Sequence, residues 1–318
     1  MTFFPKLNKI MDFAELAPLN GFLLVDKPSG ISSFDVIKRI NRRFSIQRTS
    51  KKIGHGGTLD PNASGLLVVA IGKATRLLRY FLGSDKRYIA TIEFGARTTT
   101  DDCEGEILET APFEHITREG LETALQAFRG KISQIPPNYS ALHIDGKRAY
   151  DRARHGETFE IPAREVQIHE ISILHAELPR NPVIQLDIAC SGGTYIRSIA
   201  RDLGIALGSQ AHLKALRRTR SCHFDIEQAK TLDFILKQDD ISAIMRSCSE
   251  AVAHFPTLTL ARPQAYRLLN GQPVNLNVSE DGTYAIFECD SCALISILER
   301  SNHHNDFLRL YPASDFQP

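Results

Sequence analysis

Short apolar segments separated by polar turns run through most of this chain. Four of them have the length and spacing of β-strands: Phe22–Asp26, Leu66–Ile71, Tyr88–Phe94 and Val183–Cys190. In Tyr88–Phe94 every second residue is apolar, so these side chains share one face of a strand. Leu66–Ile71 is apolar throughout, which is typical of a central strand buried on both faces. The segments therefore predict a largely buried sheet.

Other segments have the apolar spacing of α-helices. Ser32–Asp35 resembles a capping box, and the helix it starts has Phe34, Ile37, Ile40 and Phe44 as apolar positions and basic residues on its other side. Two further helices are predicted at 117–128 and at 195–203, the second directly after a turn at 191–194. Together, strands and helices predict an α+β fold around a mixed, mostly antiparallel sheet.

The pattern changes in two places. Residues 133–158 lack a clear core pattern and predict a projecting, partly helical insertion. After Ser249 a short helix at 263–269 and strands at 284–288, 293–298 and 307–311 predict a small, mostly β domain. We therefore divide the chain into residues 1–248 and 249–318.

Length and composition fit a globular protein with a main and a smaller domain. The chain has 318 residues, of which 42% are hydrophobic, and no stretch resembles a membrane span or a secretory signal, so we expect a cytoplasmic protein. Its six cysteines are scattered, which suits reduced thiols. Cys289 and Cys292 have the spacing of metal ligands, but their flanks resemble strands, and a hairpin turn is favoured over zinc.

Basic residues gather in clusters, although the net charge of the chain is only +1. Residues 249–318 hold eight acidic residues against four arginines, a balance of −4 that leaves +5 for residues 1–248. One cluster is typical of a solvated surface, but four within one domain indicate a polyanion, and nucleic acid is the leading candidate partner. The clusters are Lys38, Arg39, Arg42, Arg43, Arg48, Lys51 and Lys52; Lys73, Arg76, Arg79, Lys86 and Arg87; Lys147, Arg148, Arg152 and Arg154; and Lys214, Arg217, Arg218 and Arg220.

One glycine-rich loop, Gly54–Gly65, presents a single carboxylate, Asp60, next to Pro61. The glycines permit a close approach of ligand to backbone, and the proline restricts Asp60 to non-helical conformations. An ordinary Asp-Pro turn is the structural alternative. The phosphate-binding loop, the dinucleotide fingerprint, the serine-hydrolase elbow and the zinc-protease motif are all missing. What remains is a carboxylate able to act as nucleophile, as general base or as partner of a developing cation at a sugar carbon.

Several collinear motifs give this loop a context. They are Gly21–Pro28, Gly54–Gly65, Lys86–Tyr88, Gly95–Gly105 with Arg97, Thr98, Thr100 and Asp102, Pro136–Ala141, and Gly193–Arg197. In order and spacing, residues 20 to 220 closely resemble the bacterial tRNA pseudouridine synthase B family, whose members isomerise the uridine at position 55 in the T-loop of tRNA.

This resemblance implies roles for individual residues. Asp60 is the catalytic aspartate, Tyr88 stacks on the target base, and Arg197 pairs with the aspartate, where a guanidinium favours the ionised carboxylate and fixes its orientation. Considered without the resemblance, Tyr88 fits a core aromatic residue on a strand face equally well, and Arg197 fits a surface cation on a helix. The resemblance also assigns substrate-binding positions to four residues: His55 beside the flipped base, Lys27, Tyr195, and Leu216, which could equally be core.

The resemblance further implies a flipped base and a reaction without cofactor or metal. It implies an RNA-clamping insertion at 133–158, a PUA-like C-terminal domain, the tRNA T-arm as partner, and a monomer that needs neither membrane nor guide RNA. Two alternatives stay open: a guide-RNA-dependent relative, and a catalytically silent RNA-binding protein. The sequence leaves open whether Asp60 attacks the sugar, attacks the base or removes a sugar proton.

Overall fold

The computed structural model describes residues 19–49, 51–140, 142–144, 146–155, 157, 159–302 and 304–311. Most of the N-terminal segment, where we predict no secretory signal, lies outside these residues, as do the side chains of Arg48, Lys147, Arg148 and Arg154. Within the described part, no helix has the length and apolarity needed to cross a membrane.

A ten-stranded sheet forms the body of the molecule, with strands in the order β14-β1-β3-β12-β4-β11-β10-β7, β2 beside β3 and β13 beside β12. Only β1–β14 and β3–β12 pair in parallel, so the predicted mixed, mostly antiparallel sheet is confirmed. Its strands are β1 (Gly21–Lys27), β2 (Ile53–His55), β3 (Ser64–Ile71), β4 (Lys86–Phe94), β7 (Gly130–Gln134), β10 (Arg164–Ala176), β11 (Val183–Cys190), β12 (Ala211–Ser221), β13 (Phe224–Asp225) and β14 (Lys230–Thr231).

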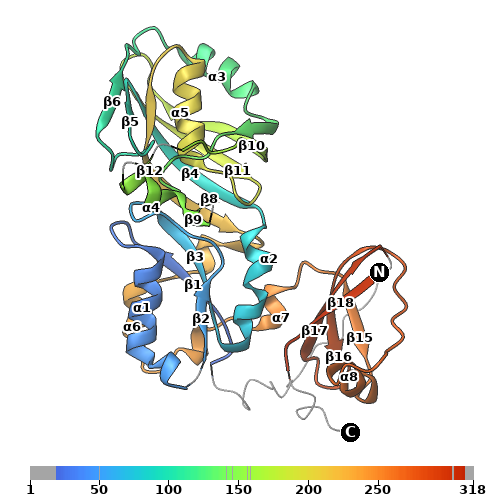
Figure 1. Cartoon of the computed structure of the whole chain (residues 1–318). Helices are drawn as coiled ribbons and strands as arrows, with labels where there is room; N and C mark the ends of the chain where they lie inside the picture. Colours follow the sequence, from blue (N-terminus) through green and yellow to red (C-terminus); the bar gives the residue numbers. More distant parts are fainter. Residues whose placement is uncertain are drawn as a thin grey trace.

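Figure 1 shows this sheet running through two lobes, one with α3 and α5 and the other with α1 and α6. The helices are α1 (Ser33–Phe44), α2 (Leu78–Leu82), α3 (Arg118–Gln126), α4 (Ala149–Arg154), α5 (Ile196–Ala206), α6 (Leu232–Leu236), α7 (Cys248–Ala251) and α8 (Arg262–Leu269). Two small hairpins, β5 (Ala96–Thr98) with β6 (Ile107–Thr110) and β8 (His143–Ile144) with β9 (Lys147–Arg148), complete this part.

Helix α1 begins as predicted and differs in its buried face. Ser32 is the N-cap, and its hydroxyl and the Asp35 carboxylate form a complete capping box. The buried apolar residues are Val36, Ile37 and Ile40, whereas Phe34 is exposed, so its predicted place on the core face is wrong. Helical spacing allows either set, and packing on the sheet selects the second.

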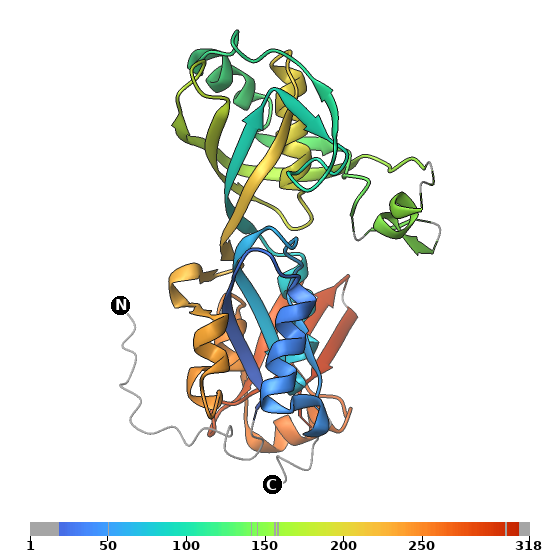
Figure 2. The same ribbon diagram turned by 90° about the vertical axis from the view of Figure 1, so that its left-hand side faces the viewer.

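The predicted insertion projects from the body, but it starts later than residue 133. Residues 133 and 134 belong to β7, which pairs with β10. The segment after them carries the β8–β9 hairpin and α4, which stand away from both lobes in Figure 2.

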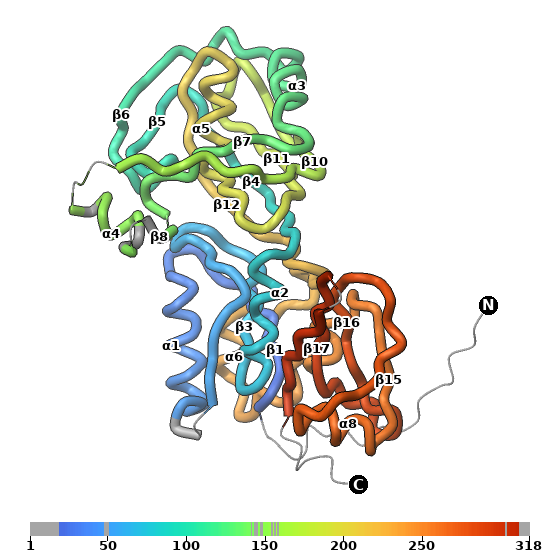
Figure 3. Tube along the Cα trace, turned by 45° about the vertical axis from the view of Figure 1, so that its right-hand side comes forward, coloured from blue at the N-terminus to red at the C-terminus, as the bar shows by residue number. Residues whose placement is uncertain are grey.

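The C-terminal region forms a separate four-stranded sheet in the order β15-β16-β17-β18, which confirms a small, mostly β domain. Its strands are β15 (Thr257–Leu260), β16 (Gly282–Glu288), β17 (Leu294–Ser301) and β18 (His304–Arg309), and β15 was not predicted. Figure 3 shows this domain beside α2. Arg79 of α2 pairs with Glu299 at 3.0 Å, and Cys248 and Ala251 of α7 join Phe22 and Ile297 in one apolar cluster. The boundary at residues 248 and 249 stays a prediction.

Candidate active site

The loop that carries Asp60 connects β2 to β3 and is fixed by the residues around it. The hydroxyl of Ser33, in the first turn of α1, donates to the Leu59 carbonyl at 2.9 Å and accepts from the Leu59 amide at 2.8 Å. The Pro61 carbonyl accepts from the Gly30 amide at 2.9 Å. The carboxylate therefore projects from a backbone that is fixed on both sides, and its side chain remains 40% exposed.

Arg197, at the start of α5, lies against this carboxylate. Its Nε is 3.0 Å from Oδ2 of Asp60, without the alignment of a hydrogen bond, and the Arg197 side chain is only 7% exposed. The two terminal nitrogens donate to the carbonyls of Thr100 at 3.1 Å and Tyr139 at 3.0 Å. The backbone thus holds the guanidinium in place beside the carboxylate.

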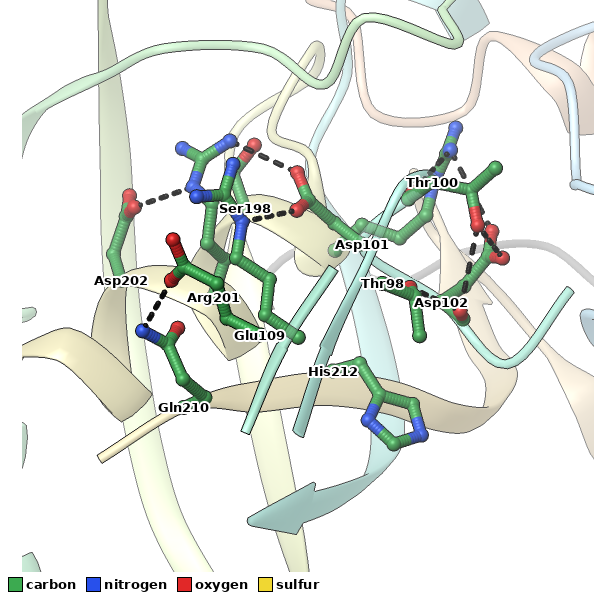
Figure 4. Close-up of polar contacts among 12 residues, drawn as sticks. Thr98, Thr100, Asp101, Asp102, Glu109, Ser198, Arg201, Asp202, Gln210 and His212 are labelled. Carbon is green, nitrogen blue, oxygen red and sulfur yellow. Dashed lines mark hydrogen bonds and ion pairs between the residues drawn. The ribbon is translucent and has the colours of Figure 1, made fainter. Parts of the chain in front are cut away.

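Arg197 also pairs with Asp102, and Arg201, one helical turn along α5, ties the same loop to the helix. Nη1 of Arg197 is 3.5 Å from Oδ2 of Asp102, and Arg201 pairs with the adjacent Asp101 at 2.9 Å and with Asp202 at 2.8 Å. Figure 4 shows Arg201 between Asp101 and Asp202, with Asp102 held by Thr100. Burial raises the pKa of Asp101 even though Arg201 opposes the shift. The segment before Cys103 is therefore tied to α5, which positions Arg197.

Tyr88 lies in β4 between Ile188 of β11 and Arg218 of β12. It is 8% exposed and belongs to the main apolar cluster. Burial raises the pKa of its hydroxyl, so the phenol is neutral at pH 7. This hydroxyl can donate a hydrogen bond at neutral pH and is a weak base.

Lys27 is fully buried at the end of β1, where its ammonium donates to three backbone carbonyls: Pro28 at 2.9 Å, Ile31 at 2.7 Å and Pro61 at 3.0 Å. Burial lowers its pKa to about 8, and the nearby charge of Asp60 opposes this shift. All three ammonium hydrogens have protein acceptors, so the side chain joins the end of β1 to the Asp60 loop.

The remaining predicted residues lie around this centre. Burial lowers the pKa of His55, the last residue of β2, and its Nδ1 is buried without a hydrogen-bond partner. The backbone of Tyr195 exchanges two hydrogen bonds with the Gln134 side chain, and its ring lies 4.7 Å from the Arg164 guanidinium. Leu216, in β12, packs against the main apolar cluster.

Arg218 is a central residue that we did not single out from the sequence. It is 1% exposed, and its guanidinium donates to the carbonyls of Leu66 at 2.7 Å, Gly57 at 3.1 Å and Thr58 at 3.5 Å. Its charge contributes to the lowered pKa of Lys27 and of His55. The sequence signal was present in the basic cluster on β12, but two adjacent arginines did not reveal which one is buried.

Comparison with known families matches residues 42–196 to the N-terminal domain of the TruB family of pseudouridylate synthases, and residues 197–247 to a tRNA pseudouridylate synthase B C-terminal domain. The tRNA pseudouridine synthase B of Thermobifida fusca is 42% identical over 287 residues, which cover 89% of this chain and 95% of that protein. The protein of the same name from Gloeobacter violaceus is 45% identical over 282 residues, covering 88% and 94%.

Solved structures agree on the fold. A Cbf5-Nop10-Gar1 complex contains a chain with a TM-score of 0.71 and 24% identity, covering 95% of this chain and 88% of that chain. A chain of the archaeal box H/ACA sRNP Nop10-Cbf5 complex has a TM-score of 0.70 and 22% identity, covering 100% and 95%. The resemblance deduced from the sequence motifs is confirmed, and the chain belongs to the TruB family of pseudouridylate synthases.

Proposed function

We propose that this pseudouridylate synthase isomerises the uridine at position 55 in the T-loop of tRNA, with Asp60 as the catalytic residue. The relatives from Thermobifida fusca and Gloeobacter violaceus are named tRNA pseudouridine synthase B, which supports tRNA as the substrate. The observation that carries the mechanism is the pair of Asp60 and Arg197. A half-exposed carboxylate lies 3.0 Å from a buried guanidinium.

The reaction conserves all atoms of the substrate. The bond between the sugar C1′ and the uracil N1 breaks, the uracil turns, and C1′ bonds to C5, whose proton moves to N1. Asp60 stabilises the detached fragment or forms a covalent bond with it through one carboxylate oxygen, and the ion pair with Arg197 orients that carboxylate. The isomerisation therefore needs no electron donor or acceptor.

The buried residues fit a uridine that leaves its stack to reach Asp60, because a stacked base hides its glycosidic bond. The neutral Tyr88 hydroxyl donates to the uracil while its ring packs against the base. Removal of the C5 proton then requires a stronger base, and Asp60, whose charge acts on Tyr88, is the candidate. His55 offers an unpaired Nδ1 beside the same loop. Tyr195 and Leu216 line the approach, and Lys27 holds the loop.

Charge on α1 supports a contact with the phosphates of the T-arm. Lys38, Arg39 and Arg42 line a shallow hollow on this helix together with Asp35, which lies 3.8 Å from the Lys38 ammonium. The cations outnumber this one carboxylate, and the Lys38 ammonium lies 4.7 Å from the centre of the exposed Phe34 ring. Cations that replace condensed counterions give salt-dependent affinity. The projecting α4 segment supplies a second contact that clamps the RNA.

We further propose that the enzyme works as a cytoplasmic monomer without a guide RNA. The neighbours in the Cbf5-Nop10-Gar1 and archaeal box H/ACA sRNP complexes share less than 25% identity with this chain and indicate a common fold. The acidic C-terminal residues, with a balance of −4, are poorly suited to a large guide-RNA surface.

The test uses purified full-length protein and an unmodified tRNA transcript, with no other addition. Pseudouridine is located by mass labelling, and RNA binding is measured in parallel. Wild type should convert one T-loop uridine, and Asp60→Asn should lower the rate by at least about 10²–10⁴-fold while RNA binding is kept. A transcript with cytidine at position 55 should give no product.

Asp239→Asn is the matched control, because Asp239 is an exposed carboxylate paired with Arg43 at 3.4 Å. It should react at the wild-type rate. Equal product from wild type and Asp60→Asn would refute the role of Asp60. Product at another uridine would keep the catalytic role and refute the site in the tRNA.

A further inference from the structure

A cluster of three side chains outside the active site has the composition of a metal centre. Cys222 and His223 lie between β12 and β13, and His254 lies between α7 and β15. The ligand atoms of these three residues all lie within 4.8 Å of one another. We propose that Cys222, His223 and His254 bind one Zn²⁺ ion at the junction of the main sheet and the C-terminal domain.

The spacing of the ligand atoms suits a tetrahedral ion. Zn–S bonds of about 2.3 Å and Zn–N bonds of about 2.0–2.1 Å put sulfur and nitrogen about 3.5 Å apart. In the structure, Nδ1 of His223 is 3.4 Å from Sγ of Cys222, and Nε2 of His254 is 3.7 Å from the same sulfur. Nδ1 of His254 is 3.9 Å from this sulfur, so either ring nitrogen of His254 can serve as the ligand. The sulfur–nitrogen distances therefore lie within a few tenths of an ångström of those around one tetrahedral ion.

The surroundings of His223 orient it as a metal ligand. Its Nε2 is 2.8 Å from the Glu250 carbonyl oxygen. A carbonyl only accepts, so the proton sits on Nε2, and the lone pair of Nδ1 faces the Cys222 sulfur. Ligating histidines usually bind a carbonyl or carboxylate through their second nitrogen in this way.

Aromatic rings form the wall behind these ligands. Phe224 lies 4.2 Å from the His223 ring, and Phe255 lies 4.1 Å from the His254 ring, measured between ring centres. His254 is exposed, which leaves the fourth position of the ion open to water. A site of three protein ligands and one water is common for zinc.

The chain positions of the ligands determine what the ion would do. Cys222 and His223 follow the strand that carries Leu216 and Arg218, whereas His254 directly precedes the first strand of the C-terminal sheet. One ion would join segments separated by 32 positions in the sequence. Bound zinc would therefore fasten the C-terminal domain to the catalytic sheet.

The test uses tag-free full-length protein that has been stripped with a chelator and then desalted. Zn²⁺ is titrated in competition with a chromophoric chelator, and Co²⁺ serves as a spectroscopic probe. We expect one site per chain, a thiolate-to-cobalt charge-transfer band, and a zinc-dependent rise in the thermal midpoint. Cys222→Ser should abolish the band and weaken zinc binding at least about a hundredfold, beyond the ~10–100-fold loss typical of an outer partner.

Two further variants distinguish zinc bound at this cluster from zinc bound by another thiol of the chain. His254→Gln changes an exposed side chain, so it should fold normally and lose most of the affinity. Cys292→Ser removes an exposed thiol from the turn between β16 and β17 and should bind zinc like wild type. Loss of the band in Cys292→Ser but not in Cys222→Ser would overturn the proposal. It would also be overturned if wild type and Cys222→Ser bound zinc equally.

Discussion

Replacing Arg218 tests how the backbone of the Asp60 loop is held. Arg218→Met leaves the buried carbonyl of Leu66 and the part-buried carbonyl of Gly57 without their arginine donors, which stand at 2.7 and 3.1 Å. A buried unsatisfied group costs roughly 1–3 kcal/mol, which applies to the Leu66 carbonyl, whereas the part-buried Gly57 carbonyl costs less because water can reach it. Removing a buried charge offsets part of this loss. Because the guanidinium already has carbonyl acceptors, we expect the hydrogen bonds to dominate, with a net loss of about 2 kcal/mol.

The assay is equilibrium unfolding in urea followed by circular dichroism, because the chain has no tryptophan. Arg218→Lys keeps the charge and N–H donors that can reach part of the carbonyl set, so it should lose less stability than Arg218→Met. The control is Arg217→Met, which removes a 41% exposed side chain paired with Asp26 at 2.8 Å and should cost about 0–1 kcal/mol. Of these three variants, only Arg218→Met should lower the rate of pseudouridine formation. An unfolding midpoint of Arg218→Met at or above that of wild type would refute this reasoning.

Two other predictions concern the same loop. Gly65→Ala would combine a φ of +102° with a Cβ 2.3 Å from the Arg218 carbonyl oxygen, so its free energy of unfolding should fall by about 2–5 kcal/mol. Gly30→Ala has a φ of +87° but free space around the Cβ, so its free energy of unfolding should fall by only about 1–2 kcal/mol. Equal urea midpoints for Gly65→Ala and Gly30→Ala would contradict the clash at Gly65. Burial lowers the pKa of Lys27 from its usual 10.5 to about 8. Between these pH values the unfolded chain binds more protons at this lysine than the folded chain does. The contribution of Lys27 to stability therefore rises with pH across that window. Lys27→Met should show a smaller rise in the free energy of unfolding from pH 8 to 10.5, and slopes equal to wild type would count against the buried charge.

The parts of the fold that the sequence predicted depend on neighbouring residues. The capping box at Ser32 and the alternation in Tyr88–Phe94 are local patterns, and the structure has both. The pairing of Asp60 with Arg197 was predicted from the family resemblance, because no local pattern joins residues so far apart. Its brace through Asp102 was not predicted, since it depends on how the loop before Cys103 packs on α5.

The burial of Arg218 could not be read from the sequence for a specific physical reason. A regular strand alternates its faces, so the parity of a position predicts which side it faces. Strand β12 breaks that alternation twice against β4, between Leu213 and Ala215 and between Arg218 and Arg220. Each irregularity resets the parity, as a β-bulge does. Arg217 and Arg218 were therefore equivalent in the sequence although one is half-exposed and the other buried.

The buried cations around Asp60 are held mainly by backbone carbonyls. Lys27, Arg197 and Arg218 each donate to at least two backbone carbonyls. These carbonyls take up the terminal nitrogens of Arg197 and the donors of Lys27 and Arg218, whereas Nε of Arg197 meets Asp60 without hydrogen-bond alignment. The carboxylate thus lies in a fixed positive field while its lone pairs stay available to the substrate, which is the preorganisation that electrostatic catalysis requires. Since the same cations hold the backbone, truncating any of them changes the charge and the loop together. Only comparisons such as Arg218→Lys with Arg218→Met can separate the two effects.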